Sequence, residues 1–143
     1  MSAHDDHAGY ATSDPVMYPE SQGSILRGIL KKDYLVIGAS FDQGSFLSKD
    51  KNDGSVADTP WKKWTVGPAA PDTNEYTLDQ IRFRDYYVDL RKAPPAAKEW
   101  LNVARPTYSF GAIYPADKGD DLAVGQAYDV LVHLHSVREA GTL

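Results

Sequence analysis

The stretch AYDVLVHLHSV, residues 127–137, carries the clearest strand pattern in this chain of 143 residues. Its side chains fall into two alternating sets, one apolar and the other mostly polar. One face would carry Tyr128, Val130, Val132 and Leu134, and the other Asp129, Leu131, His133 and His135. A period of two is typical of a β-strand, because successive side chains point to opposite faces of the sheet. The pattern therefore predicts a strand over 127–137.

Further strands are expected earlier in the chain. They are predicted at 24–30, 34–41, 61–66, 76–90 and 108–114. In the longest of them, 76–90, the apolar residues change from one face of the strand to the other near Asp85, which predicts a bulge. The charged, turn-rich residues 42–58 are expected to form a loop.

A single helix is expected at 94–104. Two prolines suit its first turn, and Pro106 would end it. Six to eight strands and one short helix predict a mainly β fold, either an antiparallel β-sandwich or a small β-barrel. The expected elements do not alternate between strands and helices, so the sequence does not indicate a parallel sheet. Residues 1–23 are predicted to be an extended acidic N-terminal arm, and residues 24–143 a single β domain.

Composition excludes several classes of protein. The chain has no cysteine, which rules out disulfides and thiolate chemistry. Its net charge of −5 argues against a nucleic-acid partner, and no apolar run is long enough to predict a membrane span. No signal peptide is evident at the N-terminus. These features favour a cytoplasmic protein or a component of an assembled particle.

The sharpest local motif is the pair His133 and His135. Residues two apart on a strand point the same way, so two imidazoles could converge on one divalent transition metal. Asp129 is expected on the same face, where it could orient one ring, and the third ligand is not identified. Ordinary histidines on an exposed or subunit-facing strand explain the pair as well. His4 is a second metal candidate, because a chain that starts Ser2-Ala3-His4 would offer a square-planar nitrogen set.

Catalytic and binding candidates lie among charged and aromatic residues. Asp85, Arg84 and Tyr87 are the catalytic candidates, because a buried Asp beside an Arg can act as a tuned acid or base. Such clusters are more often exposed ion pairs between strands. Aromatic side chains dominate binding surfaces, although at least half should fill the core. The expected ligand-binding residues are Trp61, Trp64, Tyr86, Tyr108 and Tyr114.

The missing catalytic motifs favour a non-enzymatic binding or assembly module. We expect it to use the N-terminal arm and an aromatic surface, in a homo-oligomer or with another protein. One alternative is a small β-barrel that binds a small molecule or a carbohydrate, or a cyclase- or isomerase-type enzyme with a cavity of Tyr, Asp and Arg. A second alternative is a metal-dependent protein that uses His133 and His135. No cofactor other than such a metal is expected.

Overall fold

The computed structural model describes residues 3–16, 18–53, 55, 58–108, 110–114 and 120–141. Seven strands lie in this part of the chain: β1 (Ile37–Asp50), β2 (Trp61–Val66), β3 (Tyr86–Asp89), β4 (Arg105–Thr107), β5 (Ile113–Tyr114), β6 (Asp120–Leu122) and β7 (Val130–Val137). The α-helices are α1 (Asp5–Ala8), α2 (Gln22–Leu30), α3 (Asn74–Asp79), α4 (Pro95–Leu101) and α5 (Val124–Ala127). Two short 3-10 helices are η1 (Lys31–Asp33) and η2 (Leu90–Lys92).

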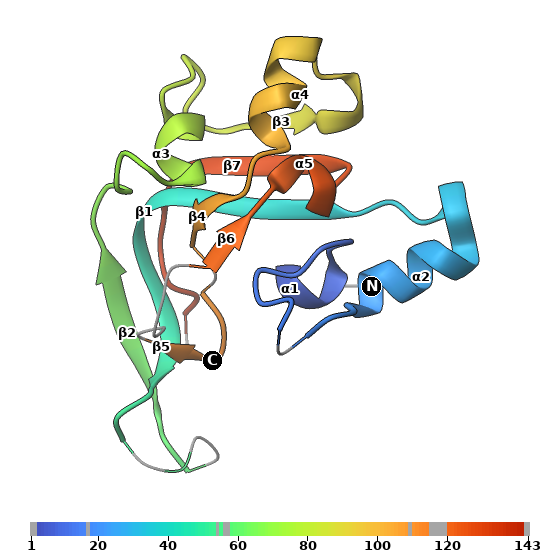
Figure 1. Cartoon of the computed structure of the whole chain (residues 1–143). Helices are drawn as coiled ribbons and strands as arrows, with labels where there is room; N and C mark the ends of the chain where they lie inside the picture. Colours follow the sequence, from blue (N-terminus) through green and yellow to red (C-terminus); the bar gives the residue numbers. More distant parts are fainter. Residues whose placement is uncertain are drawn as a thin grey trace.

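Strand β7 lies inside the main sheet, between β1 and β3. The strand order is β2-β1-β7-β3, and β5 also pairs with β1 (Figure 1). Strands β1 and β7 are parallel, whereas the β1–β2 and β3–β7 pairs are antiparallel. Strands β4 and β6 form a separate two-stranded sheet. Helices α3 and α4 lie on the β3 side of the molecule in Figure 1, and α3 contacts both β1 and β7.

The predicted fold class is correct only in part. The number of strands falls within the expected six to eight, but the described residues make a mixed α/β structure with several helices rather than one. The sheet is not a closed barrel, and its parallel β1–β7 pair contradicts the expectation of a purely antiparallel arrangement. Parallel strands need a long crossover connection. Here that connection spans residues 51–129 and contains α3, α4 and α5.

The prediction of a strand at 24–30 is wrong, because these residues belong to α2. Ser21 caps this helix by accepting a hydrogen bond from the Ser24 amide at 2.9 Å. Ile25 and Ile29 are spaced four apart, and both are exposed. Their β-branched side chains resemble a strand segment in sequence, but the cap and the helical spacing decide the local structure.

Two other regions differ from expectation for local reasons. Residues 42–50 continue strand β1 instead of forming a loop, because Gly44 to Lys49 pair with β2. Within 76–90, α3 occupies the first part and β3 only the last. Thr73 caps α3 by accepting a hydrogen bond from the Tyr76 amide at 3.2 Å. Residues 80–85 between α3 and β3 are irregular, so the switch of apolar face near Asp85 marks the start of β3 and not a bulge within a strand.

Other predicted elements are confirmed. The strand at 61–66 is β2, the helix at 94–104 contains α4, and the strand at 127–137 contains β7. Among the described residues of the expected strand at 108–114, Ile113 and Tyr114 alone form a strand. The period of two is visible in the burial of β2 and β7, because exposed and half-buried residues alternate along β2 and half-buried and buried residues alternate along the first part of β7.

The N-terminal residues fold back onto the body of the protein. They form α1, and the Tyr10 amide donates a hydrogen bond to the Ala127 carbonyl at 2.9 Å. Gly23 of α2 lies so close to Ala8 that an added Cβ would overlap its carbonyl oxygen. The described part of residues 1–23 is thus packed rather than extended, and residue 23 falls inside α2.

The core lies between the sheet and the helices that flank it. Buried side chains of β7, α3, α4 and α5 meet there, among them Leu131, Leu78, Leu101 and Val124. His133 is also fully buried, on the same face of β7 as Leu131. Among the described residues, no helix has the length and apolar character needed to cross a bilayer.

Candidate functional site

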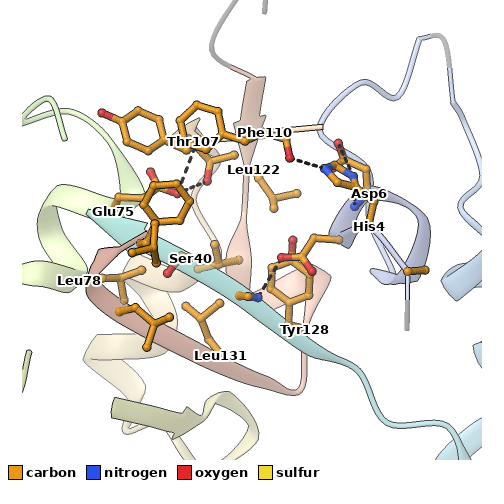
Figure 2. Close-up of a pocket in the computed structure, with 18 residues that line it drawn as sticks. His4, Asp6, Ser40, Glu75, Leu78, Thr107, Phe110, Leu122, Tyr128 and Leu131 are labelled. Atoms are coloured by element: carbon orange, nitrogen blue, oxygen red, sulfur yellow. Dashed lines mark hydrogen bonds and ion pairs between the residues drawn. The ribbon is translucent and has the colours of Figure 1, made fainter. Parts of the chain in front are cut away.

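A cavity of about 340 Å³ opens where α1, the first half of β1, α3 and residues 107–110 converge. Figure 2 shows its polar side chains on two sides, with Glu75 on one and His4 and Asp6 on the other. Leu78, Leu122 and Leu131 form much of the apolar surface between them. The cavity therefore combines an apolar interior with carboxylates and an imidazole at its edges.

Glu75 is the most unusual group in this cavity. Its side chain is buried, and its Oε1 accepts hydrogen bonds from Thr107 Oγ1 at 2.7 Å and from the Tyr108 amide at 3.1 Å. Its Oε2 is buried without a hydrogen-bond partner among the described residues. Burial raises the pKa of Glu75 above the ordinary value for a glutamate, and the hydrogen bonds only partly offset this effect. A carboxyl group in this state keeps its proton to a higher pH than an exposed glutamate does.

The opposite edge is formed by α1 and the residue before it. His4 Nε2 lies 3.1 Å from the Phe110 carbonyl oxygen, and the Asp6 amide donates to Nδ1 at 3.4 Å. This pattern places the ring proton on Nε2, because Nδ1 accepts. Asp5 accepts a hydrogen bond from the Ala39 amide at 2.9 Å, yet burial raises its pKa above the usual value. Two carboxyl groups with raised pKa values therefore line one cavity.

Aromatic rings form one wall. Phe110 stacks on Phe46 with ring centroids 4.4 Å apart, and Tyr108 lies 4.9 Å from Phe110. Tyr114 and Trp64 extend this group away from the cavity, with their centroids 5.0 Å apart. The rings pack Tyr108 and Phe110 against Phe41 and Phe46 of β1, which keeps the Phe110 carbonyl and the Tyr108 amide beside His4 and Glu75.

The expected ligand-binding residues are only partly brought together. Tyr108 lines the cavity, and Tyr114 and Trp64 support its aromatic wall. Tyr86 instead lies against His133 and donates a hydrogen bond to the Leu78 carbonyl at 3.0 Å. Trp61 is 57% exposed on β2 and contacts Lys49. Ligand binding by these side chains stays a prediction.

The catalytic candidates lie away from the cavity. Tyr87 is 77% exposed, and Arg84 and Asp85 are also exposed. The carboxylate of Asp85 accepts a hydrogen bond from the His135 amide at 2.9 Å. Asp85 therefore binds a backbone amide of β7 just beyond the end of its pairing with β3. A catalytic role for the three residues stays a prediction.

The predicted histidine pair does share one face of β7, but that face is covered. His133 Nε2 lies 3.3 Å from Asp79 Oδ1, and His135 Nδ1 lies 2.9 Å from the same oxygen. Asp129, which was expected beside them, instead accepts hydrogen bonds from Tyr10 and from the Val36 amide. The sequence missed Asp79 because α3 brings it to the pair from a distant segment. Metal binding by the pair stays a prediction.

The other metal candidate, His4, faces the cavity. The proposed nitrogen set requires removal of Met1 and uses the amine of Ser2, and both of these residues lie outside the described part of the chain. The sequence singled out His4 only as a metal ligand, and it missed Glu75 and Asp5 altogether. Thr73 followed by Asn74 and Glu75 is a helix-start pattern that could have placed Glu75 in a first turn. No local signal could have placed it beside Thr107.

Two solved structures are similar to this chain. One is a protein from Bacillus cereus, 27% identical, with a TM-score of 0.82 over 94% of this chain. The other is described as a succinoglycan biosynthesis protein, 23% identical, with a TM-score of 0.81 over 95% of this chain, which supports a common fold alone. This chain spans 32% of each of those chains. No curated protein matches it.

A protein-family model described as erythromycin esterase matches residues 1–137. This match overturns the expectation of a non-enzymatic binding or assembly module, because the family is named for a hydrolase. The small-barrel alternative also fails, since the main sheet is open. The missing catalytic motifs misled the prediction because the cavity groups come from separate segments of the chain. With almost its whole length matched, the chain belongs to the erythromycin esterase family.

Proposed function

We propose that this chain supplies a substrate cavity and acid–base groups for the hydrolysis of an ester. Membership of the erythromycin esterase family supports this reaction class. The observation that carries the proposal is the buried Glu75, which lines the cavity with one oxygen held by two donors and the other without a described partner. A buried, unpaired carboxyl group costs stability, and functional sites are where such groups gather.

Glu75 is the proposed general base. Two donors fix its Oε1, so that Oε2 is oriented and left to take a proton from water. The water oxygen attacks the ester carbonyl carbon as its proton passes to Glu75. Because burial raises the pKa of this carboxyl group, it is a stronger base than an exposed glutamate.

His4 is the proposed general acid. For this step His4 carries protons on both ring nitrogens. Its Nε2 proton, which faces the Phe110 carbonyl in this structure, passes to the leaving oxygen as the carbon–oxygen bond breaks, and the ring is left neutral. Asp6 Oδ2 lies 3.9 Å from Nδ1, the ring nitrogen that does not transfer its proton in this step. The products are a carboxylic acid and an alcohol, and solvent returns the proton from Glu75 to His4.

The cavity walls favour an ester with an apolar body. Leucine and aromatic side chains dominate the lining, and the volume of about 340 Å³ lies at the small end of ligand sites. It suits the reacting part of a larger molecule or the whole of a smaller one. We therefore assign the substrate by chemical class, as an ester whose acyl or alcohol part is apolar.

Hydrolysis of p-nitrophenyl esters with increasing acyl length, and of erythromycin, tests the proposal. We expect Glu75→Gln to lower kcat/KM by about 10²–10⁴-fold and His4→Gln by a similar factor, as for the loss of a general acid or base. Glu99→Gln, which changes an exposed carboxyl group of α4, is the matched control and should retain full activity. The acidic limb of the wild-type pH profile should report a pKa above the ordinary glutamate range.

Two results would contradict the proposal. One is an absence of hydrolysis of every ester above the rate in buffer. The other is hydrolysis that Glu75→Gln leaves unchanged, provided that circular dichroism shows the variant to be folded.

A further inference from the structure

A second polar cluster lies between α3 and the sheet, apart from the catalytic groups proposed above. Asp42 of β1 and His135 of β7 lie level on neighbouring strands, because Phe41 pairs with Leu134 and Gln43 with Ser136. Asp79, at the end of α3, reaches this pair from above the sheet. The cluster therefore draws on three elements that are far apart in sequence.

The ligand atoms of Asp42, Asp79 and His135 converge. One such atom from each residue lies within 4.8 Å of the other two. His135 Nδ1 is 2.9 Å from Asp79 Oδ1 and 3.1 Å from Oδ2. Ligands held at about 2.0–2.1 Å from one tetrahedral ion lie about 3.3 Å apart, so small side-chain shifts close this set around an ion.

We propose that Asp42, Asp79 and His135 bind one divalent transition metal, with Zn²⁺ preferred. Imidazole suits Zn²⁺ better than it suits Mg²⁺ or Ca²⁺, and the two carboxylates balance the charge of the ion. Three protein ligands leave a fourth position for water, which Zn²⁺ commonly accepts. This proposal does not depend on the esterase proposal, because none of these three residues has a role there.

Neighbouring groups already orient the ligands. The fully buried His133 has its Nδ1 2.9 Å from Ser40 Oγ and its Nε2 3.3 Å from Asp79 Oδ1. If the serine hydroxyl donates to Nδ1, the ring proton lies on Nε2 and is donated to Asp79. The Ala69 amide donates to Asp42 Oδ1 at 3.0 Å. Such outer hydrogen bonds are the usual support of metal ligands.

Without a metal ion, a ring proton of His135 can link the same side chains. That proton lies on His135 Nδ1 and is donated to Asp79, and the Gln43 amide lies 3.3 Å from His135 Nε2. Binding of an ion at Nδ1 requires this ring proton to move to Nε2. The Gln43 amide can then turn over, so that its oxygen accepts from Nε2. The two states therefore differ in the bound ion, in the nitrogen that carries the ring proton and in the rotation of one amide.

Zn²⁺ titration of the untagged chain against a chromophoric chelator tests the proposal. We expect one ion per chain, and at least a hundredfold weaker binding in both Asp79→Asn and His135→Gln. Ser40→Ala keeps all three ligands but removes the partner of His133, and should weaken binding about tenfold. His7→Gln and Asp72→Asn change an exposed imidazole and an exposed carboxylate elsewhere, and should bind as the wild type does.

Three results would overturn the proposal. The first is no stoichiometric binding by the wild type, and the second is undiminished binding in both ligand variants. The third is an equal loss in His4→Gln, which would place the ion at the N-terminal histidine. If both ligand variants unfold, a measurement on the wild type decides. Co²⁺ should broaden the NMR signals of the His135 ring and spare those of the His7 ring. Broadening at His7 without broadening at His135 would also overturn the proposal. Every readout is binding, so failure here leaves the esterase test unaffected.

Discussion

At the scale of single residues, Glu75 and Asp79 show how place decides the chemistry of a carboxyl group. They lie one turn apart on α3, yet their pKa values shift in opposite directions. Burial dominates at Glu75 and raises its pKa. At Asp79 burial also acts to raise the pKa, but hydrogen bonds from His135 and His133 outweigh it and lower the net value. One helix thus presents a proton-accepting group and an anionic ligand.

The raised pKa of Glu75 predicts how stability depends on pH. A carboxyl group whose pKa is higher in the folded state than in the unfolded state stabilises the fold when it is protonated. This contribution is fully present below the unfolded pKa of 4.5 and is lost as the pH rises through the folded pKa. Glu75→Gln does not titrate, so this variant should gain free energy of unfolding relative to wild type between pH 4 and pH 8. Urea unfolding at both values measures the difference.

The exposed Glu99→Gln is the control for that experiment, and its difference from wild type should stay nearly constant with pH. A constant difference for Glu75→Gln as well would show that its carboxyl group titrates normally in the folded chain.

At the scale of elements, periodicity identified only those segments that have one packed face. Strand β7 and helix α4 were predicted because each places its apolar side chains at regular spacing. Helix α2 was mistaken for a strand because its exposed Ile25 and Ile29 resemble β-formers, and its cap at Ser21 went unrecognised. The polar residues 42–50 resemble a loop in sequence, but backbone pairing with β2 makes them a strand.

Helix α3 is short, so its cap should matter for both proposed sites. Thr73 Oγ1 accepts from the Tyr76 amide and donates to the Ala70 carbonyl at 2.7 Å. Thr73→Ala should cost about 1 kcal/mol in free energy of unfolding. It should also lower ester hydrolysis, because Glu75 lies in the first turn. Urea unfolding and kcat/KM are the measurements.

Thr73→Ser is the matched variant, because it keeps the hydroxyl group and removes only a methyl group. It should restore most of the stability and activity that Thr73→Ala loses. Equal losses in the two variants would show that packing of the methyl group, rather than the cap, holds α3 in place.

At the scale of the whole molecule, the cavity is built from contacts that join distant segments. His4 meets Phe110 across 106 positions, and Glu75 meets Thr107 across 32. No periodic pattern encodes such pairs, which is why the sequence yielded several strands and one helix but not the cavity. The strand pattern around His133 and His135 was correct, but the covering helix that supplies Asp79 could not be predicted from it.

The packing of α2 on α1 predicts a coupling between a distant glycine and the cavity. An added Cβ at Gly23 would overlap the Ala8 carbonyl, a backbone atom that cannot move without α1. Gly23→Ala should therefore lower the free energy of unfolding by about 1–3 kcal/mol, as overpacking does. Because His4 and Asp5 belong to the same segment, ester hydrolysis should fall too.

Gly28 lies in the same helix and provides the control. An added Cβ there meets no atom within 4 Å, so Gly28→Ala should stabilise the chain by about 0.4–1 kcal/mol and leave activity unchanged. Thermal or urea unfolding together with kcat/KM separates the two effects. If Gly23→Ala lowers stability but hydrolysis per folded molecule is unchanged, α1 does not position the catalytic groups and the acid role proposed for His4 fails. If both fall while Gly28→Ala is neutral, the docking of α1 on α2 sets the geometry of the cavity.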